Sequence, residues 1–186
     1  VGGFGPENYS RIQDAINNAS ENDIVFVYDD SSPYNENITI RKSITLLGED
    51  KGTTVIEWIS NPYGIINIFY DNVAVSGFTI QHTGLKPRGS GMCIEGNECT
   101  IEGNIIQNNY FGIAITSPNV HDQCICDNII QNNSAMGIYA SASNSTISGN
   151  YIAENGYIGI ALLYGWKNKI THNIITDNHE YGIAIT

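Results

Sequence analysis

The most regular feature of the sequence is a pattern of hydrophobic and polar positions that returns every 22 to 24 residues. The segment NIIQNNYFGIAIT begins at Asn104, and close copies begin at Asn128, Asn150 and Asn173. Within each copy, stretches such as GIAIT alternate large hydrophobic residues with small or polar ones, and this alternation predicts a β-strand. A short repeat of fixed length is typical of a solenoid, in which each repeat stacks on the one before.

Isoleucines recur at fixed places in these repeats and define columns. One column contains Ile101, Ile125, Ile147 and Ile170, and a second contains Ile106, Ile130, Ile152 and Ile175. A Gly-Ile pair marks a third, at Gly64-Ile65, Gly112-Ile113, Gly137-Ile138, Gly159-Ile160 and Gly182-Ile183, with Gly91-Met92 in the remaining place. We expect about three short strands in each repeat, hydrogen-bonded to the next repeat at ~4.8 Å. The sequence therefore predicts an all-β fold, a single-stranded parallel β-helix.

Asparagines also recur in columns. The main column contains Asn109, Asn133, Asn155 and Asn178, and the starts of the four copies form another. Asparagine tolerates the left-handed backbone conformation, and its amide can bond to an asparagine above and below. We expect the main column to form a structural asparagine ladder rather than to take part in catalysis.

The two ends of the chain differ from the repeats. Residues 12–19 place Ile12 and Ile16 at helical spacing, and Ser10 with Gln13 fits a capping box, so we predict a short helix. We expect a single domain over residues 1–186, with a cap over 1–22 and coils over 23–186. The last coil has no cap of its own. Two explanations stay open: the chain is part of a longer protein, or the coil stacks on another copy.

Composition limits the classes of partner. Hydrophobic residues make up 41% and charged residues 15% of the 186 residues, which suits one folded domain with a sizeable core. The net charge of −11 argues against a nucleic-acid partner, because phosphate binding needs lysine and arginine. No hydrophobic run reaches membrane-spanning length, so we expect no membrane insertion.

The stretch from YSRIQDAINN to TTVIE resembles the opening of right-handed parallel β-helix proteins of the NosD-like and pectate-lyase-like superfamily. The later GNIIQNNYFGIAI repeats are similar to the β-helix repeats of that superfamily. The resemblance implies a right-handed coil and a secreted or cell-surface location. It does not select one activity, because the superfamily includes lyases, hydrolases, epimerases and non-catalytic surface proteins.

A catalytic site is not evident in the repeats. The polygalacturonase-like motifs N-T-D, D-D and G-H-G are missing from them. Glu102 with Asp127, and Glu154 with Asp177, occupy similar places on adjacent repeats, and such pairs could hold a cation or serve acid–base chemistry. Exposed carboxylates are usually solvated, however, and the eight lysines and arginines are scattered. We therefore assign no catalytic residue and favour a non-enzyme; an enzyme would be a polysaccharide lyase or glycoside hydrolase.

The four cysteines are candidates for disulfides or for a metal site. They are Cys93, Cys99, Cys124 and Cys126. His121 lies close to Cys124 in sequence, and this combination of soft ligands would suit copper or zinc. Adjacent repeats also bring Cα atoms within disulfide range, which favours a bond from Cys99 to Cys124 or Cys126. We expect structural cysteines, with no metal and no cofactor.

Aromatic residues on the outer faces are the candidate contacts for carbohydrate or for a protein partner. They are Tyr110, Tyr139, Tyr157, Tyr164 and Trp166. Flat aromatic rings stack on sugars and on protein surfaces alike. The segment QHTGLKPRGSG concentrates Lys86 and Arg88 and is a further candidate contact loop.

These observations favour a non-catalytic, secreted or cell-surface structural β-helix. Its expected partners are copies of itself or a longer parent chain, through the uncapped coil. The alternative is a β-helix that binds or cleaves a polysaccharide.

Overall fold

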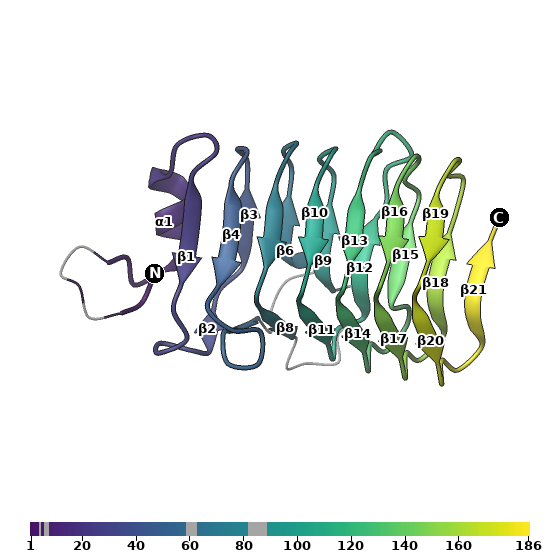
Figure 1. Cartoon of the computed structure of the whole chain (residues 1–186). Coiled ribbons are helices and arrows are strands. Elements are labelled where there is room, and N and C mark those ends of the chain that lie inside the picture. The colour runs from purple at the N-terminus through teal and green to yellow at the C-terminus, as the bar shows by residue number, and fades with distance from the viewer. Residues whose placement is uncertain (4, 6–7, 59–62, 82–88) are drawn as a thin grey trace.

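The computed structural model describes residues 1–3, 5, 8–58, 63–81 and 89–186. Within them the chain forms one short helix and three parallel sheets of seven strands each. Each strand pairs with the strand three places further along the chain, as β10 (Thr100–Glu102) does with β13 (Cys124–Cys126). The chain therefore winds as the predicted right-handed parallel β-helix, and Figure 1 shows its rungs side by side from the N-terminal helix to the last strand.

Three strands make one rung, and one strand of each rung belongs to each sheet. The first sheet contains β1 (Ile24–Val27), β4 (Thr45–Gly48), β7 (Ala74–Ser76), β10, β13, β16 (Thr146–Ser148) and β19 (Lys169–Thr171). The second contains β2 (Tyr34–Asn35), β5 (Val55–Glu57), β8 (Thr79–Gln81), β11 (Ile105–Gln107), β14 (Ile129–Gln131), β17 (Tyr151–Ala153) and β20 (Ile174–Thr176). The third contains β3 (Ile38–Ile40), β6 (Gly64–Ile68), β9 (Ser90–Ile94), β12 (Phe111–Ile115), β15 (Ile138–Ala140), β18 (Ile158–Leu162) and β21 (Tyr181–Ile185).

The isoleucine columns form the core between the three sheets. Ile101 pairs with Ile125 in the first sheet, and Ile106 pairs with Ile130 in the second, as the sequence predicts. These side chains are buried, and the residues on either side of them face outward. Because the rungs repeat this arrangement, an inward isoleucine that lies between two rungs packs over the side chains of both and is removed from water.

The register predicted for the third column, which the Gly-Ile pairs mark, is wrong at one rung. The sequence aligns Gly64 with the later glycines, but the structure places Gly64 opposite Ser90 and Ile66 opposite Met92. The Asn67 side chain holds this part of β6, because it accepts from the Gly64 N–H at 3.0 Å and donates to the Gly64 carbonyl at 2.8 Å. The column is therefore displaced by one residue there.

Inward asparagines form the predicted ladder at the corner between the second and third sheets. Asn133 N–H donates to Asn155 Oδ1 at 3.2 Å, and Asn133 Nδ2 donates to the same oxygen at 3.0 Å and to the Ile106 carbonyl at 3.2 Å. Asn109 N–H donates to Asn133 Oδ1, and Asn155 bonds to Asn178 in the same manner. The prediction of an asparagine ladder is confirmed.

The corner between the third and first sheets has a polar column that the sequence pattern did not reveal. Its members are Cys99, Gln123, Ser145 and Asn168. The Cys99 thiol donates to the Asn97 carbonyl at 3.3 Å and to the Tyr70 carbonyl at 3.5 Å. Gln123 N–H donates to Ser145 Oγ at 3.0 Å, and Ser145 N–H donates to Asn168 Oδ1 at 2.9 Å. Four different residue types, only one of them asparagine, thus bond to the backbone at this corner, as asparagine alone does at the other two corners in the later rungs.

The residue just before each inward polar residue adopts the left-handed conformation. At the corner between the second and third sheets, φ is +54° to +57° at Asn108, Asn132, Glu154 and Asp177. At the other two corners the same conformation occurs at Gly103, Asp127, Gly149 and His172, and at Glu98, Asp122, Asn144 and Lys167. From the sequence, both the left-handed turn and the inward hydrogen bonds were expected of the ladder asparagines. The structure instead divides them, because a residue that makes the turn cannot also point its side chain inward.

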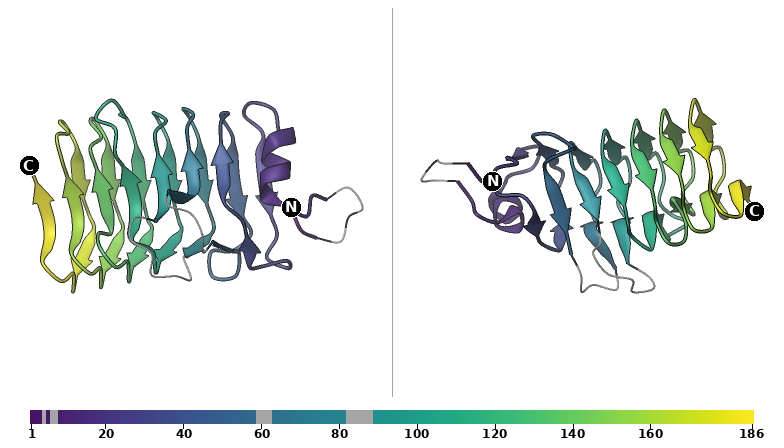
Figure 2. Two further views of the ribbon diagram at one scale, coloured as in Figure 1. Left: turned by 180° about the vertical axis from the view of Figure 1, so that it is seen from behind. Right: turned by 90° about the horizontal axis from the view of Figure 1, so that it is seen from below.

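Helix α1 (Ile12–Asn18) covers the N-terminal end of the core, as predicted (Figure 2). The Ser10–Gln13 capping box is wrong, because Arg11 is the N-cap residue and makes no side-chain cap. The Glu36 carboxylate instead accepts from the N–H groups of Ile12 at 2.8 Å and Gln13 at 3.1 Å. A carboxylate from the first rung therefore caps the helix and ties it to the coil. In the described residues no helix has the length and apolar character needed to span a bilayer.

Glycine is required in the third sheet because adjacent rungs approach closely there. A Cβ atom added at Gly137 would lie 2.7 Å from the Gly159 carbonyl oxygen and 2.9 Å from Ile152 Cγ2. The corresponding distance to the next glycine carbonyl is 2.5 Å at Gly112 and 2.6 Å at Gly159. At Gly182 the nearest atom would be 3.5 Å away.

We predict that Gly137→Ala destabilises the chain of residues 1–186 by about 2 kcal/mol, because the added methyl group forces two rungs apart. Gly182→Ala is the matched control, and we expect it to change the free energy of unfolding by less than about 1 kcal/mol. Urea denaturation at low protein concentration measures both. Equal losses for the two variants would contradict the close-packing explanation.

Candidate functional site

A hollow of about 450 Å³ lies on the outer face of the third sheet. Its walls come from β9, β12, β15, the segments that flank them and the residue before β6. The described lining residues are Tyr63, Ser90, Cys93, Glu95, Tyr110, Phe111, Ala114, Thr116 and Tyr139. Aromatic rings, one carboxylate, hydroxyl groups and a thiol therefore face the same space, and we take it as the candidate functional site.

Strand register explains the shape of the hollow. Ala114 on β12 pairs with Cys93 on β9 and with Tyr139 on β15. These three residues form one outward row across three rungs. The small Ala114 in the middle leaves a depression between larger side chains. Strand alternation thus builds the hollow without any loop that departs from the coil.

The sequence-predicted Tyr110 and Tyr139 are brought together by a third ring, Phe111. The Tyr110 and Phe111 centroids are 4.7 Å apart in an edge-to-face arrangement. The Phe111 and Tyr139 rings are stacked, with centroids 5.4 Å apart and 22° between their planes. The sequence pattern does not single out Phe111, because the equivalent first residues of other strands in this sheet are as different as Ser90 and Ile158.

The other predicted aromatic residues do not join this cluster. Tyr157 is 43% exposed, Tyr164 is 81% exposed and Trp166 is 64% exposed. Trp166 borders a separate hollow of about 500 Å³, and Lys167 Nζ lies 5.0 Å from its ring centroid. The five predicted contact residues therefore do not form one surface.

The second hollow contains a histidine–carboxylate pair. His121 Nδ1 lies 2.8 Å from Asp122 Oδ2, and Asn144 Nδ2 donates to Asp122 Oδ1. The hydrogen bond with His121, together with that from Asn144, lowers the pKa of Asp122 below its ordinary value. Both carboxylate oxygens are thus engaged, one by the adjacent His121 and the other by Asn144 in the corresponding turn of the next rung, which is a structural use of this residue.

The two carboxylate pairs suggested by the sequence lie outside the candidate site. Glu102 stands opposite Cys126 rather than Asp127, which is one residue further along. Glu154 and Asp177 are left-handed turn residues on adjacent rungs. None of the four lines the hollow on the third sheet. Lys86 and Arg88 of the candidate contact loop lie outside the described residues.

The predicted disulfide between rungs is wrong. The structure joins Cys124 to Cys126, while Cys93 and Cys99 are free. Cys99 points inward as a member of a corner column, whereas Cys124 and Cys126 flank the inward Ile125 on β13 and face outward. Rung spacing alone suggested the bond, but the side chains lie on opposite sides of the backbone.

The two free thiols are shielded from water, Cys99 fully and Cys93 in part. Burial raises the pKa of the Cys93 thiol to about 11, and the carboxylate of Glu95 acts in the same direction. Burial likewise raises the pKa of Cys99 to about 11. Both are therefore thiols rather than thiolates at neutral pH, and Cys93 contributes a weakly polar wall to the hollow and no nucleophile.

We predict that iodoacetamide labels Cys93 at pH 7 about a hundredfold more slowly in the folded protein than in urea, because the folded thiol holds far less thiolate. The folded rate will rise about tenfold per pH unit until the pH approaches the pKa. Peptide mass spectrometry measures the label, with Cys93→Ser as the control. Labelling at the rate of an unfolded cysteine at pH 7 would contradict the burial of this thiol.

Comparison with known proteins gives a family match over most of the chain. Residues 16–186 match the family model described as periplasmic copper-binding protein (NosD). A cell surface glycoprotein of Methanothermus fervidus is 34% identical over 103 residues, which are 55% of this chain and 16% of that protein. The chain thus matches about a sixth of the length of that relative.

A solved structure covers a larger share of the chain at lower identity. The A-module of the Azotobacter vinelandii mannuronan C-5 epimerase AlgE6 is 16% identical, with a TM-score of 0.35. It covers 90% of this chain and 71% of its own. At this identity and TM-score the likeness has no bearing on activity.

Proposed function

The chain belongs to the family described as periplasmic copper-binding protein (NosD), and we propose that it is a non-catalytic structural module of a cell-surface β-helix protein. The composition of the hollow on the third sheet carries this proposal. Among its described lining residues, Glu95 is the one carboxylate, and neither lysine nor arginine is present. The inward side chains, meanwhile, are committed to the core and the corner columns.

This set of groups does not suit cleavage of a polysaccharide. Glycoside hydrolysis needs two carboxylates on opposite sides of one sugar bond, and the described hollow supplies one. Removing a proton beside a uronate needs a base and a cation to stabilise the negative charge that develops. The Cys93 thiol cannot act as that base at neutral pH, since its pKa is about 11.

The family description also raises copper, and the described residues do not fit a site for it. No three His, Cys, Asp or Glu side chains come together among them to hold a metal ion. Cys124 and Cys126 are bonded to each other, and the Cys99 thiol faces backbone carbonyls. Copper sites of the usual kinds take several convergent imidazole, thiolate or thioether ligands. We therefore assign no metal role to the described residues.

A location outside the cytoplasm is part of the proposal. The matched relative is named a cell surface glycoprotein. A partly exposed disulfide on the outer face of β13 persists most readily in an oxidising compartment. A self-repelling surface with a net charge of −11 also suits a protein displayed in water.

Incubation with a panel of neutral and acidic polysaccharides tests the absence of catalysis. We expect no release of reducing ends and no new absorbance from unsaturated uronates above a heat-denatured control. Turnover that is lost on Glu95→Gln, in a variant with unchanged thermal stability, would overturn the proposal and identify the hollow as an active site.

A second candidate function is carbohydrate binding in the hollow, and the stacked rings favour it. Phe111 and Tyr139 offer flat surfaces on which the apolar face of a sugar ring can pack. Glu95 and Thr116 stand on the same hollow and can bond to sugar hydroxyls. Such binding is compatible with a structural module, because a surface protein can hold a glycan without altering it.

We predict that Tyr139→Ala lowers the affinity for a bound oligosaccharide about tenfold, because one face of the stacked pair is lost. Tyr164→Ala, which removes a more exposed ring away from the hollow, should leave the affinity unchanged. Titration calorimetry with oligosaccharides selected on a glycan array makes the measurement. No saturable binding to any glycan, or equal losses in both variants, would contradict a glycan site here.

The last described rung offers a further contact. Ile185 on β21 is 68% exposed, whereas its partner Leu162 on β18 is 6% exposed. We propose that another β-helix rung covers this rung, supplied by the same polypeptide or by a second copy. Unpaired backbone groups and stacked isoleucines favour an occupant with the same strand spacing.

We predict that the chain of residues 1–186 associates reversibly at high concentration, and that Ile185→Lys weakens this association at least tenfold by placing a charge in the contact. Tyr151→Lys adds the same charge on the outer face of β17 and should have no such effect. Sedimentation equilibrium measures both. A monomer at all concentrations would contradict pairing between copies.

A further inference from the structure

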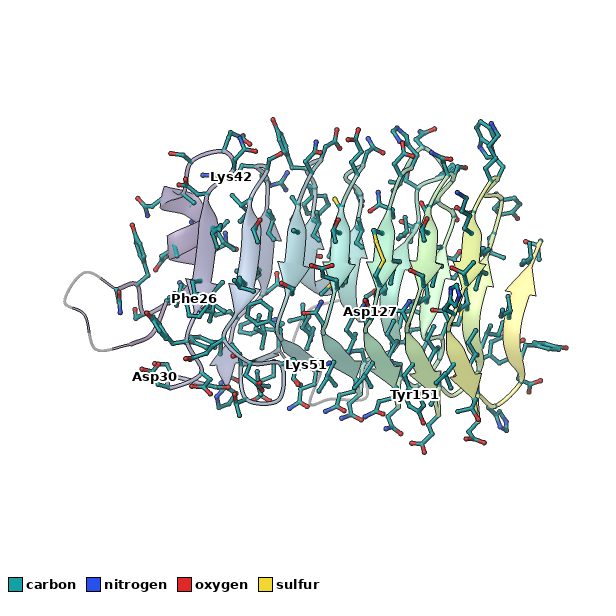
Figure 3. All side chains as sticks on the ribbon, in the orientation of Figure 1. Phe26, Asp30, Lys42, Lys51, Asp127 and Tyr151 are labelled. Atoms are coloured by element: carbon teal, nitrogen blue, oxygen red, sulfur yellow. A yellow bond between two sulfur atoms is a disulfide. The ribbon has the colours of Figure 1, made fainter. Side chains whose placement is uncertain are left out.

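The Cys124–Cys126 disulfide joins two side chains of one strand. Both residues lie on the outer face of β13 and are partly exposed, and the inward Ile125 lies between them. Figure 3 shows the sulfur–sulfur bond on the first sheet, in the same part of the coil as Asp127. The bond therefore connects neither two rungs nor two sheets, and it faces the solvent rather than the core.

Neighbouring strands show that the coil does not need this bond. In register with Cys124 and Cys126, β10 carries Thr100 and Glu102. At the same places, β16 carries Thr146 and Ser148. Both strands pair in the same geometry without a covalent link. A disulfide stabilises a fold by lowering the entropy of the unfolded chain, and this effect grows with the length of the loop that it closes. A loop with one intervening residue therefore contributes very little to the stability of the fold.

We propose that Cys124 and Cys126 form a reversible thiol–disulfide exchange site that opens and closes while the β-helix stays folded. Its co-reactants are thiols, either a small thiol such as glutathione or a dithiol of another protein. The thiolate of the co-reactant attacks Cys124 Sγ, the sulfur–sulfur bond breaks, and Cys126 leaves as a thiolate that takes a proton from water. A second thiolate then attacks the mixed disulfide and releases Cys124. Two thiols are oxidised to one disulfide, and the protein gains a dithiol.

The surroundings of Cys126 select it as the leaving sulfur. Ser148 Oγ donates to Cys126 Sγ at 3.5 Å, and this donor stabilises the thiolate that departs. Glu102 stands opposite Cys126 on the other side and opposes a negative charge. Glu102 is exposed and screened by water, whereas the hydroxyl is in direct contact, so we expect the hydrogen bond to prevail.

The other two cysteines do not interfere with exchange. Cys99 is buried in a corner column, and Cys93 lies on the third sheet rather than the first. Both are protonated at neutral pH and react slowly with disulfides. Internal rearrangement to another pairing would also require Cys99 to turn from the inside of the coil to the outside.

Reduction of the folded protein tests the proposal. The protein is equilibrated at pH 7.5 in glutathione buffers of increasing reducing power, alkylated with iodoacetamide and mapped by mass spectrometry. We expect two alkyl groups, on Cys124 and Cys126, with unchanged far-ultraviolet circular dichroism. The double variant Cys124→Ser/Cys126→Ser should fold with the same spectrum and take up no label under these conditions.

Ser148→Ala tests the direction of attack. We expect it to slow reduction by glutathione about threefold, because a donor to the leaving thiolate is removed. In the single variant Cys126→Ser, Cys124 should accumulate as the glutathione mixed disulfide. Three results would overturn the proposal: reduction only after unfolding in urea, loss of the β-sheet spectrum on reduction, or a double variant that fails to fold. An unchanged rate in Ser148→Ala would overturn the assignment of Cys126 as the leaving sulfur.

Discussion

The whole structure depends on hydrogen-bonding the backbone at the corners of each rung. A turn leaves N–H and carbonyl groups that point into the coil, where no water can reach them. The solution is the same at all three corners: a left-handed residue makes the turn, and the next side chain points inward to bond to the adjacent rungs. Because an inward side chain such as that of Asn133 bonds to the rung before it and to the rung after it, neighbouring rungs fix each other's register. The sheets and the isoleucine columns follow from that register.

The sequence reveals those corners only where one residue type repeats. Asparagine fills two corners in the four later rungs, and isoleucine recurs at the inward strand positions. The ladder and the isoleucine columns could therefore be predicted from the spacing of these two residue types alone. The third corner uses Cys99, Gln123 and Ser145 for the same task and leaves no periodic signal. The helix cap escaped prediction for a different reason, since Glu36 is 24 residues from the N–H group of Ile12. Local patterns such as a capping box do not include a partner supplied by the first rung of the coil.

The outer faces are free of the corner constraint, and the candidate chemistry lies there. Outward positions in the third sheet are as different as Cys93, Ala114 and Tyr139 on successive rungs, although their strands pair in one register. The repeat predicts that each of these three residues faces outward, but it does not predict the hollow that their side chains form together. A hollow arises from the order of large and small residues across rungs that are more than twenty residues apart in sequence. Only the winding of the chain brings that order together.

The separation of inward and outward positions also explains how one rigid coil can carry two unrelated sites. The hollow lies on the third sheet and the Cys124–Cys126 pair on the first, and the corners between them are held by side chains that take part in neither. A change of ligand or redox state on one face alters no inward bond, so it gives the other face no reason to move. In a solenoid of this kind, adding a site to a face costs little stability, whereas changing a ladder asparagine such as Asn133 disturbs three rungs at once.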